Sequence, residues 1–484
     1  MNLIRSAIKY IPGTLIPALL TLISTAIFTN LLDTSEYGYF MLAMSVINIL
    51  TAVSAEWLKQ SIARYLPGVM ENEKILKIKS SIFLSVIYIL ILFIFVSIIA
   101  APLFMDKIHL YVFIVILTIL NIIYFILLVI LQSELKSGLY SIFNLILSIF
   151  KLAFPIILIY KFNESVNQIL LGYILALIFI IIPMFINVKI RIRITIKSYK
   201  DPVITQYIKS FVKYGLPMIM FFLSAQLLNS GDRFIIQIFY GADQVGIYSA
   251  NYSLIYGGIG LISTPIMLAV SPMIMRLKIS NRNSEVQGLI SKMTTYYLAG
   301  AIPFIVLIFL LGNDAVSILL DHKFATSNYL IGIISIGFVL WQLSMYGHKV
   351  YEVSDKTLNM MIYSIITAVA NIVINFLLVP SFGLIGAAWA TSLSYFIYCC
   401  LVYFGSKKFF LWKISWDILI NIFIALIIGL LVILILFLIF NNDSILFKMF
   451  LCFVFNITYL FYLMLVYRKK VKRIYYNKFK KGII

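Results

Sequence analysis

The chain is dominated by long apolar runs of about twenty residues, separated by short breaks that contain charged residues, glycine, proline or asparagine. A helix of about this length crosses the roughly 30 Å hydrocarbon core of a bilayer. The least regular run is 246–274, because glycines and prolines interrupt it. The pattern predicts fourteen membrane-spanning helices, at 11–32, 38–58, 81–101, 110–131, 139–160, 166–187, 214–239, 246–274, 295–312, 328–347, 358–379, 384–404, 416–440 and 446–467.

The composition agrees with this pattern. Of the 484 residues, 63% are hydrophobic and 12% are charged, whereas about a quarter are charged in soluble domains. So few charged groups cannot cover a soluble protein, and an all-α polytopic membrane protein is predicted. Cys399, Cys400 and Cys452 all lie within apolar runs, so neither a disulfide framework nor metal-ligand spacing is indicated. We expect no metal and no cofactor.

Basic residues are distributed unevenly across the predicted loops. Arg5 and Lys9 precede the first apolar run as in a signal peptide, but this run is too long and lacks a cleavage site, so it is expected to be a retained span. Of the 38 lysines and arginines, 32 fall on the side of the termini, four on the other side, and two, Lys151 and Arg233, inside spans. Cytoplasmic loops are enriched in basic residues, which places both termini in the cytoplasm. The net charge of +20 then reflects these loops and the tail 468–484, expected to bind an anionic membrane surface and not nucleic acid.

The longest predicted cytoplasmic loop marks a junction between two halves of the chain. It covers about 188–213 and follows the sixth span. Within it, apolar residues recur at helical spacing, which predicts a short helix lying in the membrane interface. These residues are Ile204, Tyr207, Ile208 and Phe211.

The first outer turns of the two halves are similar. Glu-Tyr-Gly-Tyr at 36–39 follows span one, and Val-Gly-Ile-Tyr at 245–248 occupies the corresponding place after span seven. Both copies begin inside and run outward, as parallel repeats do. We predict two six-helix lobes in a V-shaped alternating-access arrangement, plus two extra C-terminal helices. The expected segments are an N-lobe (1–188), a linker (189–213), a C-lobe (214–405), spans thirteen and fourteen (406–467) and a basic tail (468–484).

Lys151 is the sharpest candidate for transport chemistry. It lies about twelve residues into its span, too deep for the amine to reach either interface. Its side chain is therefore expected to face the interior of the bundle. A structural ion pair, or a lysine bonded to backbone carbonyls, is the alternative.

Asp232 and Arg233 lie near the outer end of span seven. Helix neighbours point about 100° apart, so each is expected to have a different partner. In one arrangement Asp232 fixes a contact between lobes while Arg233 faces the cavity. A salt bridge between helices that holds the outward gate is the alternative. Amides within spans are candidates for binding a polar ligand or for joining helices: Asn144, Gln226, Asn229, Asn371 and Asn375.

Four segments resemble the polysaccharide repeat-unit flippases of the multidrug/oligosaccharidyl-lipid/polysaccharide exporter superfamily, over roughly residues 1–405. They are LLDTSEYGYF (31–40), KYGLP (213–217), the stretch from NSGDRFII to VGIYSANYSL (229–254) and NIVINFLLVPSFGLIGAAWATSLSY (371–395). Their order and spacing carry the resemblance, since each glycine-turn pattern alone recurs in other membrane proteins.

The resemblance implies a flippase that turns an undecaprenyl-diphosphate-linked oligosaccharide from the cytoplasmic to the outer leaflet of a bacterial inner membrane. For such a cargo, Lys151 and Arg233 would bind the diphosphate, since the planar fork of Arg233 suits phosphate. The amides would bind the sugar hydroxyls. Surface polysaccharide such as O-antigen, capsule or a teichoic-type polymer would be the product. Membrane lipids, a polysaccharide polymerase and a chain-length regulator are the partners that it implies.

Two other classes of function are weighed against this one. A drug or cation antiporter of the same superfamily is expected to carry a carboxylate cluster in the N-lobe, where only Glu56 is offered, close to Lys59 at a cytoplasmic end. A membrane-embedded glycan polymerase or transferase needs grouped acid, base or metal-binding residues, and the predicted outer loops are short. His348 is expected in a solvated turn. We therefore predict a transporter and not an enzyme.

Overall fold

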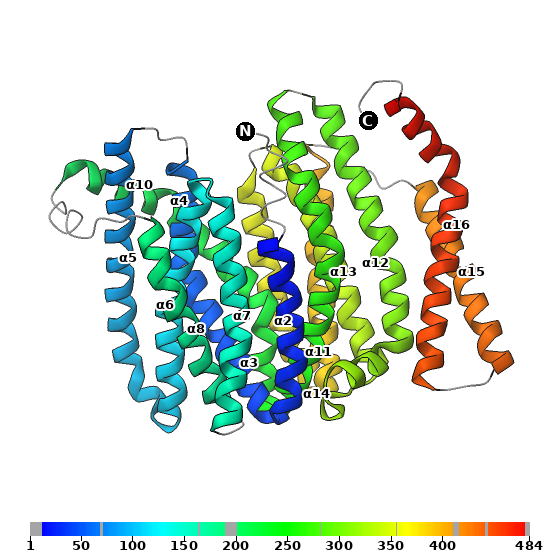
Figure 1. Cartoon of the computed structure of the whole chain (residues 1–484), viewed down its shortest axis with the longest axis horizontal. Coiled ribbons are helices and arrows are strands. Elements are labelled where there is room, and N and C mark those ends of the chain that lie inside the picture. The colour runs from blue at the N-terminus through cyan, green and yellow to red at the C-terminus, as the bar shows by residue number, and fades with distance from the viewer. Residues whose placement is uncertain are drawn as a thin grey trace.

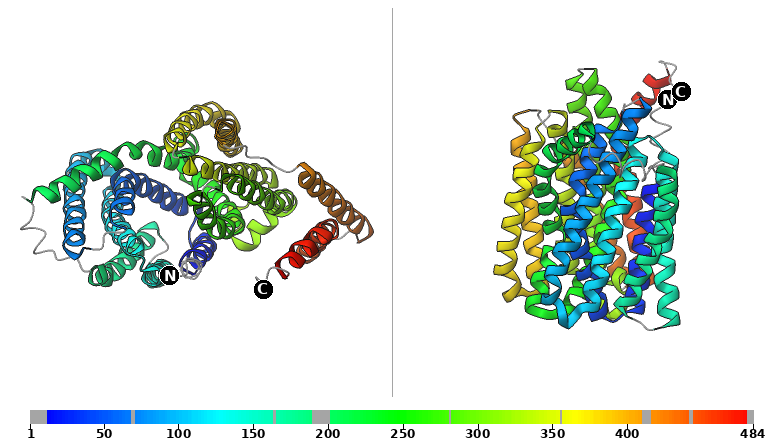
Figure 2. Two further views of the ribbon diagram at one scale, coloured as in Figure 1. Left: turned by 90° about the horizontal axis from the view of Figure 1, so that it is seen from above. Right: turned by 90° about the vertical axis from the view of Figure 1, so that its left-hand side faces the viewer.

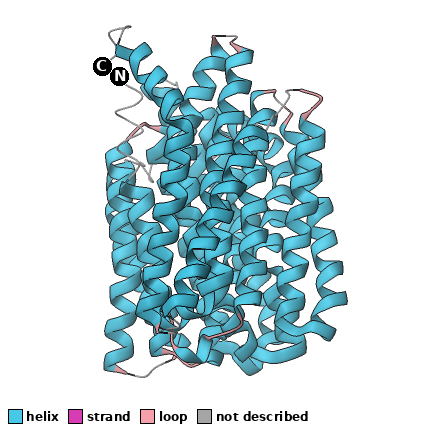
Figure 3. Cartoon of the chain, turned by 90° about the vertical axis from the view of Figure 1, so that its right-hand side faces the viewer, coloured by secondary structure: helices cyan, strands magenta, loops and turns pink. Residues whose placement is uncertain are grey.

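The structure is a computed structural model, and nearly every residue that it describes is helical (Figure 3). No strand occurs among these residues. The described residues are 12–67, 71–162, 165–188, 201–280, 282–354, 356–409, 416–440 and 444–479.

The first half of the chain forms the N-lobe. A π-helical turn, Ala52–Glu56, joins α3 to α4, and a 3₁₀ turn, Ala101–Lys107, joins α5 to α6. The α-helices of this lobe are α2 (Pro12–Leu31), α3 (Thr34–Thr51), α4 (Trp57–Tyr65), α5 (Asn72–Ala100), α6 (Ile108–Ser133), α7 (Ser137–Lys161) and α8 (Val166–Val188).

The second half contains a linker helix, the C-lobe and an added pair of helices. A 3₁₀ turn, Leu216–Met218, connects the linker helix α10 to α11. The helices are α10 (Pro202–Gly215), α11 (Ile219–Ile279), α12 (Asn283–Leu319), α13 (Asn328–Val353), α14 (Thr357–Ser406), α15 (Trp416–Phe440) and α16 (Ile445–Phe479).

Two of the C-lobe helices are hairpins of two membrane-crossing arms. α11 bends at Gly241 and α14 at Gly383, and both glycines have a positive φ that other residues rarely adopt. The arms of α11 are side by side, because the Tyr252 hydroxyl donates to Asn229 Oδ1 at 3.0 Å. The two reversals therefore occur at glycines and not at the prolines that also lie inside helices.

The predicted number of spans agrees with these helices. Ten helices in the described part of the chain are long and apolar enough to cross a membrane. Three of them contain two arms that meet at the 101–107 turn, at Gly241 and at Gly383. Taken separately and together with the shorter apolar helix Leu15–Leu31, these arms correspond to the fourteen predicted spans. The chain is a multi-pass, all-α membrane protein, as predicted.

The two ends of the helix bundle differ in charge. α2 begins and α16 ends at the end where α10 lies, which we call the α10 end (Figure 1). The turns between α2 and α3 and between α5 and α6 lie at the opposite end. Gly241 lies there too, because its neighbour Ala242 meets Gly38 near the start of α3, and so does Gly383, which lies beside Tyr240. The predicted basic loops between 59 and 408 belong to the α10 end. The basic residues of these loops are therefore concentrated at one end of the helix bundle.

The predicted linker helix exists, but protein covers its apolar face. Ile204 and Phe211 are buried, and α10 packs on α4 and α5 of the N-lobe. The Ser61 hydroxyl donates to the Phe211 carbonyl at 2.9 Å, and a Cβ at Gly215 would lie 2.3 Å from the Trp57 carbonyl oxygen. This close contact between α10 and α4 holds the start of the C-lobe on the N-lobe. The first part of the linker, 189–200, and the residues 1–11 and 480–484 lie outside the described residues.

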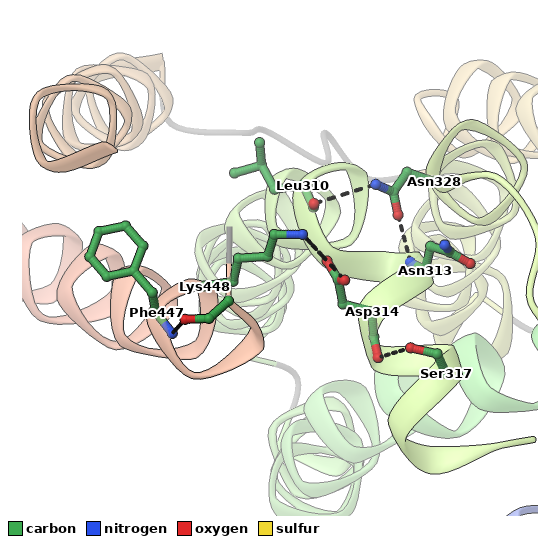
Figure 4. Close-up of polar contacts among 8 residues, drawn as sticks. Leu310, Asn313, Asp314, Ser317, Asn328, Phe447 and Lys448 are labelled. Carbon is green, nitrogen blue, oxygen red and sulfur yellow. Dashed lines mark hydrogen bonds and ion pairs between the residues drawn. The ribbon is translucent and has the colours of Figure 1, made fainter. Parts of the chain in front are cut away.

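The added pair, α15 and α16, lies at the margin of the bundle beside α12 (Figure 2). The Tyr459 hydroxyl donates to the Ala299 carbonyl at 2.6 Å. At the end opposite α10, the Lys448 amine lies 3.3 Å from the Asp314 carboxylate (Figure 4). A mainly apolar groove of about 450 Å³ lies between α12 and the pair. Its lining consists of Leu310 and Leu311 of α12, Leu430, Ile433, Leu434 and Phe437 of α15, and Lys448, Leu451 and Cys452 of α16.

Candidate functional site

Lys151 lies on the buried stripe of α7, as its depth in the sequence predicts. Residues four positions apart along this helix form the stripe, and Phe143, Leu147 and Pro155 on it are buried. The Lys151 amine lies 5.1 Å from the centre of the Tyr173 ring on α8. This cation–π contact directs the amine toward the interior of the N-lobe and away from lipid.

The Lys151 ammonium has no carboxylate partner among the described residues within 4 Å. The ion-pair alternative is therefore not what the structure shows. The contact of α7 with α8 fixes the position of the amine, because a Cβ at Gly172 would lie 2.6 Å from the Pro155 nitrogen. Pro155 is four residues from Lys151, and Gly172 is next to Tyr173.

Asn144 also lies on α7, but its side chain is hydrogen-bonded to another helix. Its Oδ1 accepts a hydrogen bond from the Tyr124 hydroxyl of α6 at 2.5 Å. In this state the amide joins two helices of the N-lobe, which is the second of the two roles considered for the amides.

Asp232 and Arg233 are both buried, and they have different partners, as predicted. The Asp232 carboxylate accepts from the backbone N–H of Arg233 at 2.9 Å and from the Thr391 hydroxyl of α14 at 3.3 Å. The Arg233 Nη1 donates to the Ser45 hydroxyl of α3 at 3.0 Å, and its guanidinium carbon lies 5.2 Å from the centre of the Tyr252 ring. The roles expected for the two are thus exchanged, since Arg233 makes the contact between lobes and Asp232 bonds within the C-lobe.

Asn229, Asn371 and Asn375 lie on α11 and α14 of the C-lobe. Asn229 accepts from Tyr252, and Asn371 Nδ2 donates to the Ser394 hydroxyl at 3.2 Å. Asn375 Nδ2 donates to the Asn371 carbonyl at 2.9 Å, while its buried Oδ1 has no partner among the described residues. The arms of α11 and α14 thus carry a group of hydrogen-bonded polar side chains inside the lobe.

The two lobes touch most closely where α3 and α11 cross, at the end opposite α10. A Cβ at Gly38 would lie 1.9 Å from the Ala242 carbonyl oxygen, and a Cβ at Gly246 would lie 2.0 Å from the Thr34 carbonyl oxygen. The Thr34 hydroxyl also donates to Asp243 Oδ1 at 2.7 Å. Each helix therefore places a glycine against a backbone carbonyl of the other, as small residues allow in membrane helix crossings. We call these contacts the lobe crossing.

The lobe crossing joins the two turns that the sequence repeat relates. Gly38 and Gly246 occupy corresponding places in the repeat, and each has its carbonyl partner four residues before the other glycine. The Tyr37 and Phe324 rings extend the contact at 5.5 Å between centres, and Lys323 lies 3.7 Å from Asp33. The repeat thus signalled the position of the crossing, although not that the two copies touch.

Two further expectations have different outcomes. Glu56 pairs with Lys59 at 2.5 Å, as their spacing predicted. His348, however, is buried, and its Nε2 lies 2.7 Å from the Tyr398 hydroxyl. The expectation of a solvated turn is wrong because α13 continues as a helix to Val353, so His348 lies within the packed lobe.

Three partners in the site were not singled out from the sequence. Ser45, Tyr173 and Thr391 contact Arg233, Lys151 and Asp232 respectively. A serine, a tyrosine and a threonine inside apolar helices give no local signal, because many such residues bond only within their own helix.

Comparison with known proteins identifies the family. A family model described as polysaccharide biosynthesis protein matches residues 3–278. The chain belongs to this family. The family that the four sequence segments predicted is therefore confirmed.

One relative and two solved structures define the resemblance further. The chain is 25% identical over 287 residues to the capsular polysaccharide biosynthesis protein CapF of Staphylococcus aureus, covering 57% of this chain and 67% of that protein. The lipid II flippase MurJ in an inward closed conformation has the same fold, with a TM-score of 0.76, 16% identity and coverage of 96% and 100% of the two chains. An inward-facing multidrug transporter of the MATE family within the MOP superfamily matches with a TM-score of 0.62, 14% identity and coverage of 82% and 97%.

These similarities show that the chain has the fold of MurJ and of the MATE-family structure. At such low identities, the two solved structures establish the fold and not the cargo. The predicted two-lobed architecture with added C-terminal helices agrees with the match to MurJ over its whole length. The residue boundaries assigned to the lobes, the linker and the tail stay a prediction.

Proposed function

We propose that this family member flips an undecaprenyl-diphosphate-linked oligosaccharide from the cytoplasmic to the outer leaflet for surface polysaccharide biosynthesis. The observation that carries the proposal is the pair of cations inside the spans, Lys151 and Arg233. Among the described residues, no carboxylate lies within 4 Å of the charged side-chain nitrogens of either one. An unpaired cation in a membrane span is costly. A diphosphate that enters the lobe interface would offset this cost, and the cations would offset the desolvation of the diphosphate.

The other candidate residues take roles around these cations. Asp232 joins α11 to α14 through Thr391, and the amides of Asn229, Asn371 and Asn375 offer hydrogen bonds to sugar hydroxyls when the lobes separate. Asn144 does the same on the N-lobe side. The long prenyl tail stays in lipid, because only the polar head needs a path through the protein.

The proposed function is tested by reconstitution. Purified protein in vesicles is given a defined undecaprenyl-diphosphate oligosaccharide in one leaflet, and its appearance in the other leaflet is measured with an impermeant lectin or glycosidase. We expect transfer that depends on the protein and is lost when the oligosaccharide is offered on a lipid without phosphate. Equal rates with and without protein would overturn the proposal.

Rocking of the lobes about the α10 side is the proposed movement. The lobe crossing closes the end opposite α10, while the contact of α10 with α4 holds the lobes together at the other end. Opening the crossing would expose the lobe interface to the outer side. This is alternating access, with the linker helix as the pivot.

We propose that the α10 end is cytoplasmic and that the membrane is the bacterial inner membrane. The basic residues gathered at this end support the orientation. Cysteines placed after Arg468 should be inaccessible to an impermeant thiol reagent in intact cells, and a cysteine in the 101–107 turn should be labelled, once Cys399, Cys400 and Cys452 are replaced by alanine. The reverse pattern would contradict the orientation.

Flipping is expected to respond to membrane potential. With the inside negative, outward movement of each net negative charge is favoured by about 2.3 kcal/mol per 100 mV, roughly a fifty-fold bias. This holds if Lys151 and Arg233 stay on their helices while the diphosphate passes. Vesicles with the potential clamped by potassium and valinomycin measure the dependence, and flipping that ignores the potential at fixed ion gradients would rule out this driving force.

A cation-coupled drug antiporter is the second candidate. The buried carboxylate of Asp232 favours it, because such a group can exchange a proton or a sodium ion. In that case transport should follow the gradient of the ion and should be lost in Asp232→Asn, and a drug should cross in place of the lipid-linked sugar. The same vesicles distinguish the two functions. A polysaccharide polymerase and a chain-length regulator are the protein partners that we propose for the flippase.

A further inference from the structure

Arg233 is held in an incomplete environment. Only 6% of the residue is exposed, and the hydrogen bond to Ser45 is the one that the described residues provide to its side chain. The Nε atom is buried without a partner. A guanidinium carries five N–H donors, and buried donors are normally satisfied. The stacking on Tyr252 supports the plane of the group but accepts none of these donors in a hydrogen bond.

The bond to Ser45 joins the lobes. Ser45 belongs to α3 of the N-lobe and lies two helical turns from Gly38 of the lobe crossing. The Ser45 hydroxyl donates to the Met41 carbonyl at 2.7 Å, so its oxygen is turned to accept from Arg233. Separation of the lobes at the crossing would break the Arg233–Ser45 bond and leave the guanidinium on the C-lobe.

Asp232 would not take the place of Ser45. Its carboxylate is already bonded to Thr391 and to the backbone of its own helix, both within the C-lobe. These bonds do not cross the lobe interface, so they remain when the lobes separate. The freed guanidinium then lacks partners on the side that faces the opening.

We propose that Arg233 is an anion site that becomes available only when the lobe crossing opens. On the proposed function, its ligand is the diphosphate of the cargo in the outward-open state, since a guanidinium fork binds phosphate oxygens in pairs. Lys151 on the N-lobe binds the anion in the closed state, and Arg233 on the C-lobe binds it once the lobes have separated. Ser45 is the group that hides the site.

The experiment measures binding of inorganic diphosphate to the purified full-length protein in detergent. A Lys151→Gln background removes binding at the other cation. Ser45→Ala is expected to tighten the apparent affinity at least about threefold, because it removes the competing partner and populates the binding-competent state. Arg233→Gln and the Ser45→Ala/Arg233→Gln double variant should lose this binding. Ser249→Ala is the matched control, since Ser249 is equally buried and its hydroxyl has no partner in the described part of the chain.

A purely structural tie between the lobes predicts another result. Ser45→Ala and Arg233→Gln would then act alike, because both break the same bond. If Arg233→Gln fails to fold, two other variants test the inference. Arg233→Lys keeps the charge and should retain part of the binding, and Ser45→Ala should still tighten it. Diphosphate affinity that is unchanged or weaker in Ser45→Ala would overturn the inference. It would leave flipping by the wild-type protein, and so the proposed function, untouched.

Discussion

Replacement of Lys151 by alanine is expected to abolish flipping in reconstituted vesicles while leaving the amount of protein in the membrane unchanged. The amine lies on the buried stripe of α7 and contacts no carboxylate among the described residues, so its removal breaks no ion pair that holds the helices. What is lost is the charge that compensates the diphosphate. Lys151→Arg should retain part of the activity, because the charge remains at a longer reach.

Tyr173 provides the matched control for this prediction. Tyr173→Phe keeps the aromatic face beneath the amine and should flip at close to the wild-type rate, whereas Tyr173→Leu removes the face and should lower the rate. The cation–π contact is worth about 0.5–2 kcal/mol, so a roughly 2- to 30-fold loss is expected. Normal transport by Lys151→Ala would show that the lysine is not needed for the cargo.

Gly38→Ala and Gly246→Ala are expected to hold the protein open at the end opposite α10. Each new Cβ would lie about 2 Å from a backbone carbonyl oxygen of the other lobe, and a backbone atom has no rotamer with which to move away. Overpacking of this kind costs about 1–3 kcal/mol in the closed state, which shifts the equilibrium between closed and open roughly 5- to 150-fold. Flipping should fall because the transporter no longer closes.

The open state can be detected directly. Ser249→Cys, in a variant lacking the three native cysteines, places a thiol at a fully buried position one turn beyond Gly246. An impermeant reagent should label it rapidly from outside in Gly38→Ala and slowly in the parent. Gly260→Ala on the same helix is the control, because a Cβ there meets nothing within 4 Å. Equal labelling in all three backgrounds would show that the crossing is not the outer gate.

Much of the fold could be predicted because the sequence of each helix shows whether that helix crosses the membrane and how deep its residues lie. The length of the apolar runs identified the spans. The uneven distribution of basic residues showed which loops lie on the same side, since a bilayer constrains every segment in the same way. Depth within a span alone indicated that Lys151 faces inward, and helical periodicity then relates it to the buried stripe of α7. The similarity of the turns around Gly38 and Gly246 indicated a repeat before any contact was known.

Which helix packs against each helix face was decided by the tertiary structure alone. Arg233 and Ser45 are 188 positions apart, and nothing in either helix specifies that they meet. The same holds for the bond of Asp232 to Thr391, and for the burial of His348 beside Tyr398. Periodicity determines which residues share a face, a property of one helix, whereas the identity of the covering helix depends on how closely several backbones approach. At the lobe crossing that approach is set by two glycines that contact the opposite carbonyls, and this is why Arg233 lies against the N-lobe in the closed state.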